Sequence, residues 1–273
     1  MRRRQHSKRA NPTAALITGA SSGIGQAFAR EMPEATDLIL TGRDEKALSG
    51  LVLELRSPDR CVEMVIADLA TEQGQEAVVE AASAMSIDLL INNAGTGRFG
   101  RFLENETQAH RMTIGVNAEA MTVLCARLLP EMLARARLKG IRAGLINVIS
   151  TAAFTAVPRF GVYAATKAYA LSFTEMLTSE LEREPVDILA VYPGPVRTSF
   201  GKRAGFEGGV LPGAIEPRRV AQRALQALGS RHVVFTDPPS ELTLAPLMHM
   251  RARLSKGIDF GVSAVQCFRR QRN

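Results

Sequence analysis

The chain contains no tryptophan, and it is poor in the residues that hold metals or form disulfides. Among 273 residues there are four histidines, which are scattered without metal-ligand spacing, and three cysteines without a CxxC motif. This pattern argues against a disulfide framework and a zinc site, so we expect no bound metal. Cys61, Cys125 and Cys267 are typical of free thiols in a reducing compartment. We therefore expect a cytoplasmic location.

Long apolar runs are also missing. No stretch of about 18 apolar residues occurs, which predicts that the chain has no transmembrane helix. The basic N-terminus is followed by NPTAALITGASSG at residues 11–23, which turns polar and glycine-rich too soon for a signal peptide. The sequence therefore predicts neither an integral membrane segment nor a secretion signal.

Positive charge is in excess, but it lies at the two ends of the chain. The formal net charge of +7 invites a nucleic-acid-binding or membrane-surface interpretation. Five positive residues lie within residues 1–9 and three within 269–273, so the rest of the chain has a formal charge of −1. We expect the ends to be solvated tails without a nucleic-acid partner, with binding to an anionic surface as the alternative. The positive residues at the ends are Arg2, Arg3, Arg4, Lys8, Arg9, Arg269, Arg270 and Arg272.

Short apolar runs alternate with longer stretches of helical periodicity. Continuous apolar strands that alternate with helices indicate a parallel sheet covered on both faces. We therefore predict a single doubly wound Rossmann-type α/β domain, with a seven-stranded parallel sheet and helices on both faces. The expected strands are 14–20, 37–42, 61–68, 88–95, 144–150, 187–194 and 232–237, and the expected helices are 23–32, 44–57, 71–85, 121–139, 163–183 and 217–229.

No linker, composition break or internal repeat divides this pattern. We expect a basic tail at 1–12, the dinucleotide-binding and catalytic domain at 13–240, and a C-terminal helical extension with a basic tail at 241–273. Residues 195–216 combine glycine, proline and charge without periodicity, which is typical of a lid or substrate-binding loop. The amphipathic spacing within 242–254 favours packing on the core or on another subunit over membrane contact.

A glycine-rich turn, TGASSGIG, follows the first expected strand and opens the first helix. Glycines at such a turn let the backbone approach a pyrophosphate, while the helix offers free amides and its positive dipole end. The spacing is GxxxGxG, which differs from the GxGxxG fingerprint, but its position at the first strand–helix junction favours dinucleotide binding. The predicted cofactor contacts in this turn are Gly19, Ser21, Ser22, Gly23, Ile24 and Gly25.

The end of the second strand predicts which dinucleotide is bound. An acidic residue usually grips the ribose hydroxyls of NAD at this position, whereas here Thr41 and Gly42 are followed by Arg43. A guanidinium can bind the 2′-phosphate of NADP through two hydrogen bonds. The alternative is a surface arginine beside Asp44 that only opens the next helix. We predict a preference for NADP(H), with NAD(H) possible.

Seven short motifs occur in the order and spacing of one known family. From about residue 13 to residue 200 the chain resembles a classical short-chain dehydrogenase/reductase, a family of single-domain Rossmann-fold enzymes. The matching motifs are TGASSGIG at 18–25, AD ending at Asp68, NNAG at 92–95, VN ending at Asn117, INVIS ending at Ser150, YAATK at 163–167 and PGPVRT at 193–198.

The resemblance implies roles for individual residues. Ser150, thirteen residues before Tyr163, would bind the substrate carbonyl, whereas Thr151 is displaced by one position. Tyr163 would donate the proton, Lys167 would bind the nicotinamide ribose, and Asn117 would join a proton relay. Asp68 would face the adenine, and Thr198 would meet the carboxamide. The other cofactor contacts that the resemblance implies are Leu69, Asn93, Ala94, Gly95, Pro193, Gly194 and Val196.

The pair Tyr163 and Lys167 also has a direct chemical interpretation. Residues four apart share one face of a helix, and a positive Lys beside a Tyr stabilises the phenolate, so we expect a lowered phenol pKa. Reduction of a ketone needs a proton on the developing alkoxide, which such a Tyr can donate, and a Ser hydroxyl can stabilise the oxyanion. The alternative is a Tyr at the edge of a core beside a Lys whose stem is buried.

The sequence thus predicts an NADP-preferring oxidoreductase that reduces a carbonyl or oxidises a secondary alcohol. Phenylalanines in and near the expected loops favour a hydrophobic substrate, and the long helices 118–138 and 160–183 favour a homodimer or homotetramer. The alternative is a non-catalytic NADP-binding regulatory protein of the same fold. The phenylalanines are Phe99, Phe102, Phe154, Phe160, Phe200 and Phe206.

Overall fold

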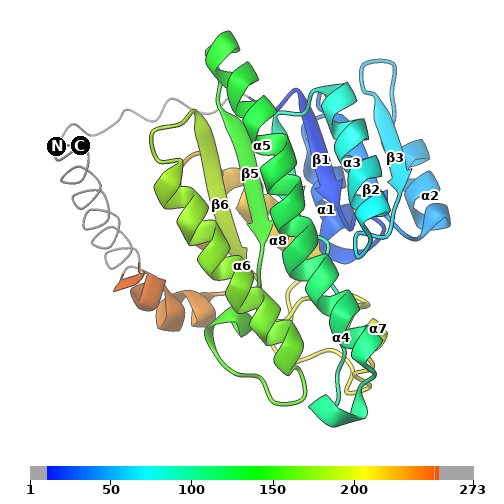
Figure 1. Cartoon of the computed structure of the whole chain (residues 1–273), viewed down its shortest axis with the longest axis vertical. Helices are drawn as coiled ribbons and strands as arrows, with labels where there is room; N and C mark the ends of the chain where they lie inside the picture. The colour runs from blue at the N-terminus through cyan, green and yellow to red at the C-terminus, as the bar shows by residue number, and fades with distance from the viewer. Residues whose placement is uncertain (1–10, 249, 252–273) are drawn as a thin grey trace, which may run out of the picture.

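A seven-stranded sheet forms the centre of the molecule in a computed structural model that describes residues 11–248 and 250–251 (Figure 1). The strand order is β3-β2-β1-β4-β5-β6-β7, and every neighbouring pair is parallel. This confirms the predicted doubly wound seven-stranded sheet. The strands are β1 Ala14–Thr18, β2 Asp37–Gly42, β3 Val62–Ile66, β4 Leu89–Asn92, β5 Ala143–Val148, β6 Val186–Tyr192 and β7 Val233–Phe235.

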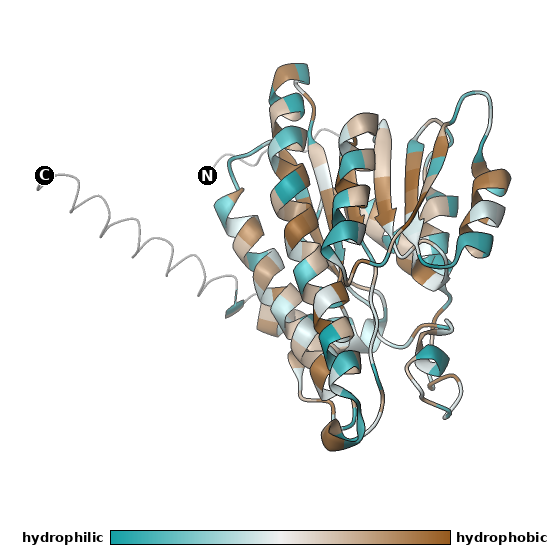
Figure 2. Cartoon of the chain, turned by 45° about the vertical axis from the view of Figure 1, so that its right-hand side comes forward, coloured by the Kyte–Doolittle hydropathy of each residue, from teal (hydrophilic) through white to brown (hydrophobic). Residues whose placement is uncertain are grey.

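The inner strands are buried because they are apolar on both faces. All residues of β1, β4, β5 and β6 are buried. Figure 2 shows hydrophobic brown both on strands of the sheet and on helices that cover it. Consecutive residues enter different cores: Ile17 packs with one apolar cluster and Leu16 with another. The edge strand β3 differs, because Met64 and Ile66 are exposed. Each strand ends two or three residues earlier than we predicted, except β2, whose bounds match.

Helices cover both faces of the sheet (Figure 1). One core cluster joins the sheet to α1, α2 and α8, and the other joins it to α3 and α5. The helix α6 packs through Ala170 and Leu171 against Tyr192 of β6. The predicted helices are present as α1 Gly23–Glu31, α2 Glu45–Leu55, α3 Glu72–Met85, α5 Ala120–Lys139, α6 Gly161–Glu180 and α8 Pro217–Ala227.

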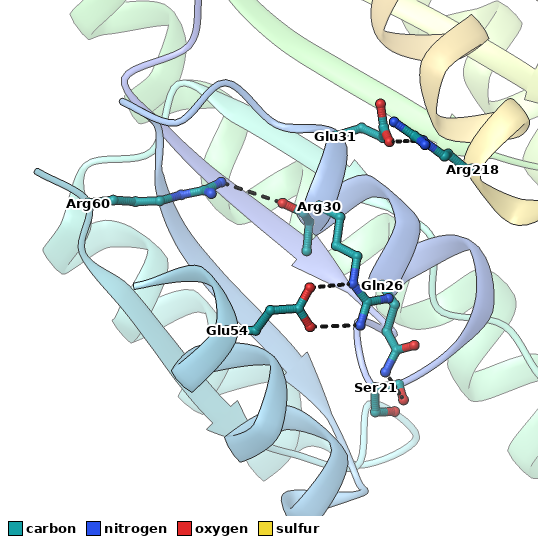
Figure 3. A network of polar contacts seen from close by, with 8 residues as sticks. Ser21, Gln26, Arg30, Glu31, Glu54, Arg60 and Arg218 are labelled. Atoms are coloured by element: carbon teal, nitrogen blue, oxygen red, sulfur yellow. Dashed lines mark hydrogen bonds and ion pairs between the residues drawn. The ribbon is translucent and has the colours of Figure 1, made fainter. Parts of the chain in front are cut away.

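Polar contacts hold α1 against α2 and α8 (Figure 3). Arg30 binds Glu54 of α2 through two hydrogen bonds of 2.7 and 2.9 Å. On the opposite side, Arg218 of α8 binds Glu31. These exposed pairs add little free energy individually, but they orient the helix that begins at the glycine turn.

Several helical segments were not predicted. The turn η1 Phe102–Glu104 and the short helix α7 Phe200–Arg203 lie in expected loops. The helix α4 Thr107–Ile114 precedes α5 and joins it through the π-helical turn η2 Gly115–Glu119. A third short helix, η3 Thr151–Phe154, follows β5.

The helix Thr107–Lys139 is the one described helix whose length and mean hydropathy of 1.3 suffice to cross a membrane. However, 56% of its most apolar window is buried inside the structure. The helix packs on α3 through the core cluster of Leu124, Leu128 and Met132. This is the environment of a core helix, so the hydropathy of this segment is weak evidence for a membrane span.

The C-terminal extension is helical over residues 238–248 and 250–251, which agrees with the amphipathic segment expected at 242–254 as far as the structure describes it. Met248 packs with Tyr192 and Phe235, and Arg251 binds Glu175 of α6. Both basic ends and Cys267 lie outside the described residues. The division of the chain at residues 12 and 240 stays a prediction.

Candidate active site

The candidate site lies at the carboxyl ends of the central strands. Parallel sheets bind ligands beyond these ends, at the point where the strand order reverses. Here β1 is flanked by β2 and β4, so this point lies between β1 and β4. The glycine turn follows β1 and the NNAG motif runs from the end of β4. Ser150 follows β5 by two residues, and Pro193 follows β6 directly. The fold therefore gathers the predicted residues at one edge of the sheet.

Each of the three glycines in the turn lies too close to its neighbours to be replaced by a residue with a side chain. Gly19 has a φ of +67°, and a Cβ there would lie 2.8 Å from the Ala94 Cα. A Cβ on Gly25 would lie 2.2 Å from the Gly19 carbonyl oxygen. Gly23 also has a positive φ, and a Cβ there would lie 2.8 Å from the Thr198 methyl group. Because these three positions carry no side chain, the backbone of the turn is uncovered at the start of α1.

Thr18 and Asn93 tie this turn to β4. The Thr18 hydroxyl accepts hydrogen bonds from the backbone N–H groups of Asn93 and Ala94, both at 2.9 Å. The Asn93 side chain donates to the Thr18 carbonyl at 2.8 Å. The side chain of Asn93 thus positions the turn. We had predicted only that Asn93 lines the cofactor. Thr18 itself was not predicted.

Arg43 extends from the end of β2 across the site. Its Nη1 lies 4.0 Å from the Asp68 carboxylate and 3.8 Å from the sulfur of Met112 on α4. The neighbouring Asp44 caps α2 by accepting a hydrogen bond from the Ala47 N–H at 3.0 Å. The guanidinium is 57% exposed and is not a partner of Asp44. Arg43 therefore reaches towards the site, beside the backbone of Gly42.

Three other predicted contacts have additional structural roles. Leu69 is 5% exposed and packs in the core between the sheet and α3. Val196 forms an isolated β-bridge with Ile215, which links the two ends of the loop 195–216. Gly194 approaches Asp237 so closely that a Cβ would lie 2.6 Å from the carboxylate. The side chain of Leu69 is thus directed into the core.

Ser150 and Tyr163 form the expected pair. Ser150 caps the short helix η3, and its Oγ accepts a hydrogen bond from the Ala152 N–H at 3.1 Å. Burial raises the pKa of the Tyr163 phenol to about 12, although a hydrogen bond with the Ser150 side chain acts to lower it. The expectation of a lowered phenol pKa is therefore wrong for this structure. The desolvation of the phenol by its neighbours outweighs the hydrogen bond.

Lys167 is buried beneath Tyr163. Its side chain donates a hydrogen bond to the Val148 carbonyl at 3.0 Å, and its Nζ lies 5.7 Å from the centroid of the Tyr163 ring. Burial lowers the pKa of Lys167 from 10.5 to about 8. The alternative interpretation required a Lys with a buried stem and a solvated ammonium. Lys167 does not fit it, because this residue is only 3% exposed.

Asn117 lies in the π-helical turn η2, where the extra residue turns its side chain towards the site. π-helical turns inside α-helices are frequent at functional sites. Asn117 is 1% exposed, and a Cβ on Gly95 would lie 3.6 Å from both its Oδ1 and the Lys167 Nζ. The predicted residues Gly95, Asn117 and Lys167 are therefore neighbours.

Aromatic rings cover Tyr163. The centroids of Phe160 and Phe200 lie 4.8 and 5.2 Å from that of Tyr163. Phe99 continues this cover at 6.1 Å from Phe160, and Phe206 lies 5.1 Å from Phe99. These are four of the six phenylalanines that we predicted to line a hydrophobic pocket.

The other two predicted phenylalanines do not join the aromatic cover. Phe102 is 65% exposed and stacks on His110, and Phe154 packs on Tyr192 and Phe235. Both nevertheless line a cavity of about 610 Å³, which lies between α4, α6 and the loops 98–105 and 153–159. The residues that line this cavity include Ala164 and Ala165 of α6, whereas Tyr163 is not among them.

Comparison with known proteins agrees with this arrangement. The sequence pattern of the family described as short chain dehydrogenase matches residues 13–205. The chain belongs to this family of oxidoreductases. It is 31% identical over 236 residues to the Dehydrogenase/reductase SDR family member 7B of Xenopus laevis, with 79% of this chain and 71% of the relative covered.

Two solved structures share both the fold and the cofactor class. A short-chain dehydrogenase from Sphingobium yanoikuyae in complex with NADPH has a TM-score of 0.77 and 30% identity, with 90% of this chain and 95% of that chain covered. A short-chain dehydrogenase/reductase from Burkholderia phymatum in complex with NAD has a TM-score of 0.77 and 26% identity, with the same coverage of both chains. The family thus includes similar structures with either nucleotide.

Proposed function

We propose that this chain is an NADP-preferring carbonyl reductase or secondary-alcohol dehydrogenase. The observation that carries the proposal is the grouping of Ser150, Tyr163 and Lys167, in which the phenol is hydrogen-bonded to one residue and stacked above the ammonium of the other. A non-catalytic dinucleotide-binding protein would have no need of a buried proton donor in this position. The grouping therefore favours turnover over a regulatory role.

The residues present fit a dinucleotide. The close approaches at Gly19, Gly23 and Gly25 leave room at the N-terminus of α1, where free amides favour an anionic phosphate. Arg43 and the absence of a side chain at Gly42 suit a 2′-phosphate. Asp68, the segment Asn93–Gly95 and Thr198 would complete the cofactor site.

The mechanism follows from the protonation states of the side chains. The bound nicotinamide would supply or accept the hydride. Tyr163, with its raised pKa, carries its proton at neutral pH and would donate it to the developing alkoxide. Ser150 would hold the carbonyl oxygen by a hydrogen bond, and Lys167 would stabilise the phenolate that remains. At neutral pH the raised pKa of Tyr163 therefore leaves the phenol in the acid form that reduction needs, whereas oxidation would need the phenolate.

The substrate side of the proposed site is apolar. Phe160 and Phe200 pack against the ring of Tyr163, and Phe99 packs on Phe160. Such rings favour a hydrophobic ketone through burial of apolar surface. Because Phe200 belongs to the loop 195–216, this loop would have to shift to admit a bulky substrate.

A substrate panel tests this proposal. Purified protein is mixed with NADPH and hydrophobic ketones, and the loss of NADPH absorbance is followed, with Ser150→Ala as the control. Turnover that disappears in the control supports the proposal. NADPH binding without turnover of any ketone or alcohol would instead favour the regulatory alternative.

We also propose a homo-oligomer and a cytoplasmic location. Ile114, Tyr169 and Met176 expose 50%, 43% and 37% of their surface on α4 and α6, so these helices offer an apolar face to a second copy. Light scattering at micromolar concentration should show a multiple of the 29.5 kDa chain. A single 29.5 kDa species would contradict this assembly.

A further inference from the structure

We propose that Arg203, on the helix α7, acts together with Arg43 as a second specificity-determining residue for the 2′-phosphate of NADP. The proposal rests on the NADP preference proposed above and assigns to it a residue outside the glycine turn and β2. It also gives the loop 195–216 a second task, because this loop carries Phe200 to the substrate side and Arg203 to the cofactor side.

The loop 195–216 lies against the cofactor side of the molecule. Figures 1 and 2 both place α7 beyond the carboxyl ends of β1 and β2. Thr198 contacts the glycine turn, since a Cβ on Gly23 would lie 2.8 Å from its methyl group. At the other end of α7, the Ala204 carbonyl accepts a hydrogen bond from the Phe99 N–H at 2.7 Å. The segment 198–204, which carries the exposed residue Arg203, is therefore held between the glycine turn and the loop that follows β4.

Arg203 and Arg43 are close enough to affect each other. Burial and the positive charge of Arg43 both lower the pKa of the Arg203 guanidinium. The described contact of the Arg203 side chain is with the Ser199 hydroxyl. Within the described residues no salt bridge joins Arg203 to a carboxylate, and the pair of Arg43 with Asp68 is long, at 4.0 Å. Two guanidinium groups therefore lie near each other with little compensation by negative charge.

Like charges repel, so an anion that lies between the two guanidinium groups would stabilise this arrangement. A phosphate monoester carries up to two negative charges and accepts hydrogen bonds from several guanidinium groups. The 2′-phosphate distinguishes NADP from NAD, and Arg43 already stands where the family binds the adenosine ribose. The chemistry therefore points to the 2′-phosphate as the shared ligand of the two arginines.

The first experiment measures cofactor binding. NADPH and NADH are titrated by fluorescence into wild-type protein and into the variants Arg203→Gln and Lys202→Gln at constant ionic strength. Lys202 is the matched control, because it is the adjacent cation on the same short helix. We expect Arg203→Gln to raise the Kd of NADPH about tenfold, which is about 1.4 kcal/mol, with NADH changed by less than about twofold. Lys202→Gln should change neither Kd.

The outcomes separate this inference from the proposed function. Equal losses for both cofactors in Arg203→Gln, or equal effects of Lys202→Gln, would overturn the role of Arg203. In that case, a loss of the NADPH preference in Arg43→Ala would show that the proposed function still holds without a role for Arg203. If the wild-type protein bound NADPH no better than NADH, the proposed cofactor preference itself would fail, and the inference with it.

A second readout follows the loop directly and does not depend on activity. Limited trypsin digestion is followed by mass spectrometry at the Lys202–residue 203 bond, which is present in both the wild type and Arg203→Gln. We expect NADPH to slow this cleavage more than NADH does in the wild type, because the 2′-phosphate would hold α7 in place. In Arg203→Gln the two cofactors should protect equally. Retention of the full NADPH effect in the variant would overturn the proposal even if the protein were slightly destabilised.

Discussion

Asn117 binds both backbone groups of Thr96. Its Oδ1 accepts a hydrogen bond from the Thr96 N–H, and its Nδ2 donates to the Thr96 carbonyl, both at 2.8 Å. The Nδ2 also donates to the Thr166 hydroxyl at 2.9 Å. Asn117 thus joins the π-helical turn η2, the loop after β4 and the helix α6. The proton relay implied for this residue stays a prediction, whereas its positioning contacts are observed.

We predict that Asn117→Leu lowers both stability and activity. The change leaves the Thr96 N–H and carbonyl without their partner. An unsatisfied buried group costs about 1–3 kcal/mol, and because Thr96 is only half-buried we expect a loss near the lower end of this range. Urea unfolding should show the loss, and the variant Asn117→Asp should lie between the two, because it can accept from the Thr96 N–H but cannot donate. A variant Asn117→Leu as stable as the wild type would contradict this role.

The proton donor is tested by Tyr163→Phe. Removal of the phenolic hydroxyl should lower kcat by about 10²-fold or more, the usual scale of general acid catalysis. The Kd of NADPH should change little, because the hydroxyl is not expected to anchor the cofactor. Steady-state kinetics and a binding titration on the same preparation measure both quantities. Near-normal turnover would exclude Tyr163 as the proton donor.

The raised pKa of Tyr163 predicts that only the oxidative direction depends on its titration between about pH 6 and pH 10. Below about pH 12 the phenol of the free protein is mostly protonated. The titration of Tyr163 should therefore not change kcat/KM for reduction near neutral pH. Oxidation needs the phenolate, whose fraction rises tenfold per pH unit, so kcat/KM for oxidation should rise steadily with pH. Stopped assays between about pH 6 and pH 10 test this. An oxidation rate that levels off near pH 7 would mean that the phenol pKa is lowered in the free protein.

Lys167 predicts a stability that rises with pH. Its pKa falls from 10.5 in the unfolded chain to about 8 in the folded protein, so below pH 8 the folded state must bury a charged ammonium. Between these values the folded state releases its proton first, the unfolded state binds more protons, and stability increases. The full difference corresponds to about 3 kcal/mol.

The variant Lys167→Met tests this sign. At about pH 7 it should unfold at a higher temperature than the wild type, since no buried charge remains, while it loses activity. The advantage should shrink as the pH rises towards about 9.5. A variant that is less stable than the wild type at both pH values would show that the hydrogen bond from Lys167 to the Val148 carbonyl outweighs the burial of charge.

The parts of the site that the sequence predicted are those set by regular geometry. Helical spacing places Tyr163 above Lys167, and parallel strand ends bring Ser150 and the glycine turn together. The contacts of Asn117 with Thr96 and the cover of Tyr163 by Phe200 depend on a π-helical turn and on loop conformation, which have no periodic signal. The error in the Tyr163 pKa has the same origin, because the desolvation depends on these packed neighbours.

Cofactor choice is the last prediction, and it depends on Arg43 and Gly42. A charge-assisted contact of about 1.5–3 kcal/mol corresponds to about a tenfold to hundredfold preference for NADP. Arg43→Ala should therefore raise the Kd of NADPH by that factor and leave that of NADH nearly unchanged, because the exposed 4.0 Å pair with Asp68 contributes little. Equal losses for both cofactors would mean that Arg43 is structural.

The companion variant Gly42→Asp should shift the preference towards NADH, because a carboxylate accepts hydrogen bonds from free ribose hydroxyls and repels a phosphate. The structure adds a steric condition, since a Cβ at this position would lie 2.9 Å from the Ser21 hydroxyl. Gly42→Ala is therefore the necessary control: it introduces the same Cβ without charge and should weaken both cofactors alike. The ratio of the two Kd values in Gly42→Asp, divided by that in Gly42→Ala, isolates the effect of the carboxylate. A quotient near one would show that the end of β2 does not read the ribose.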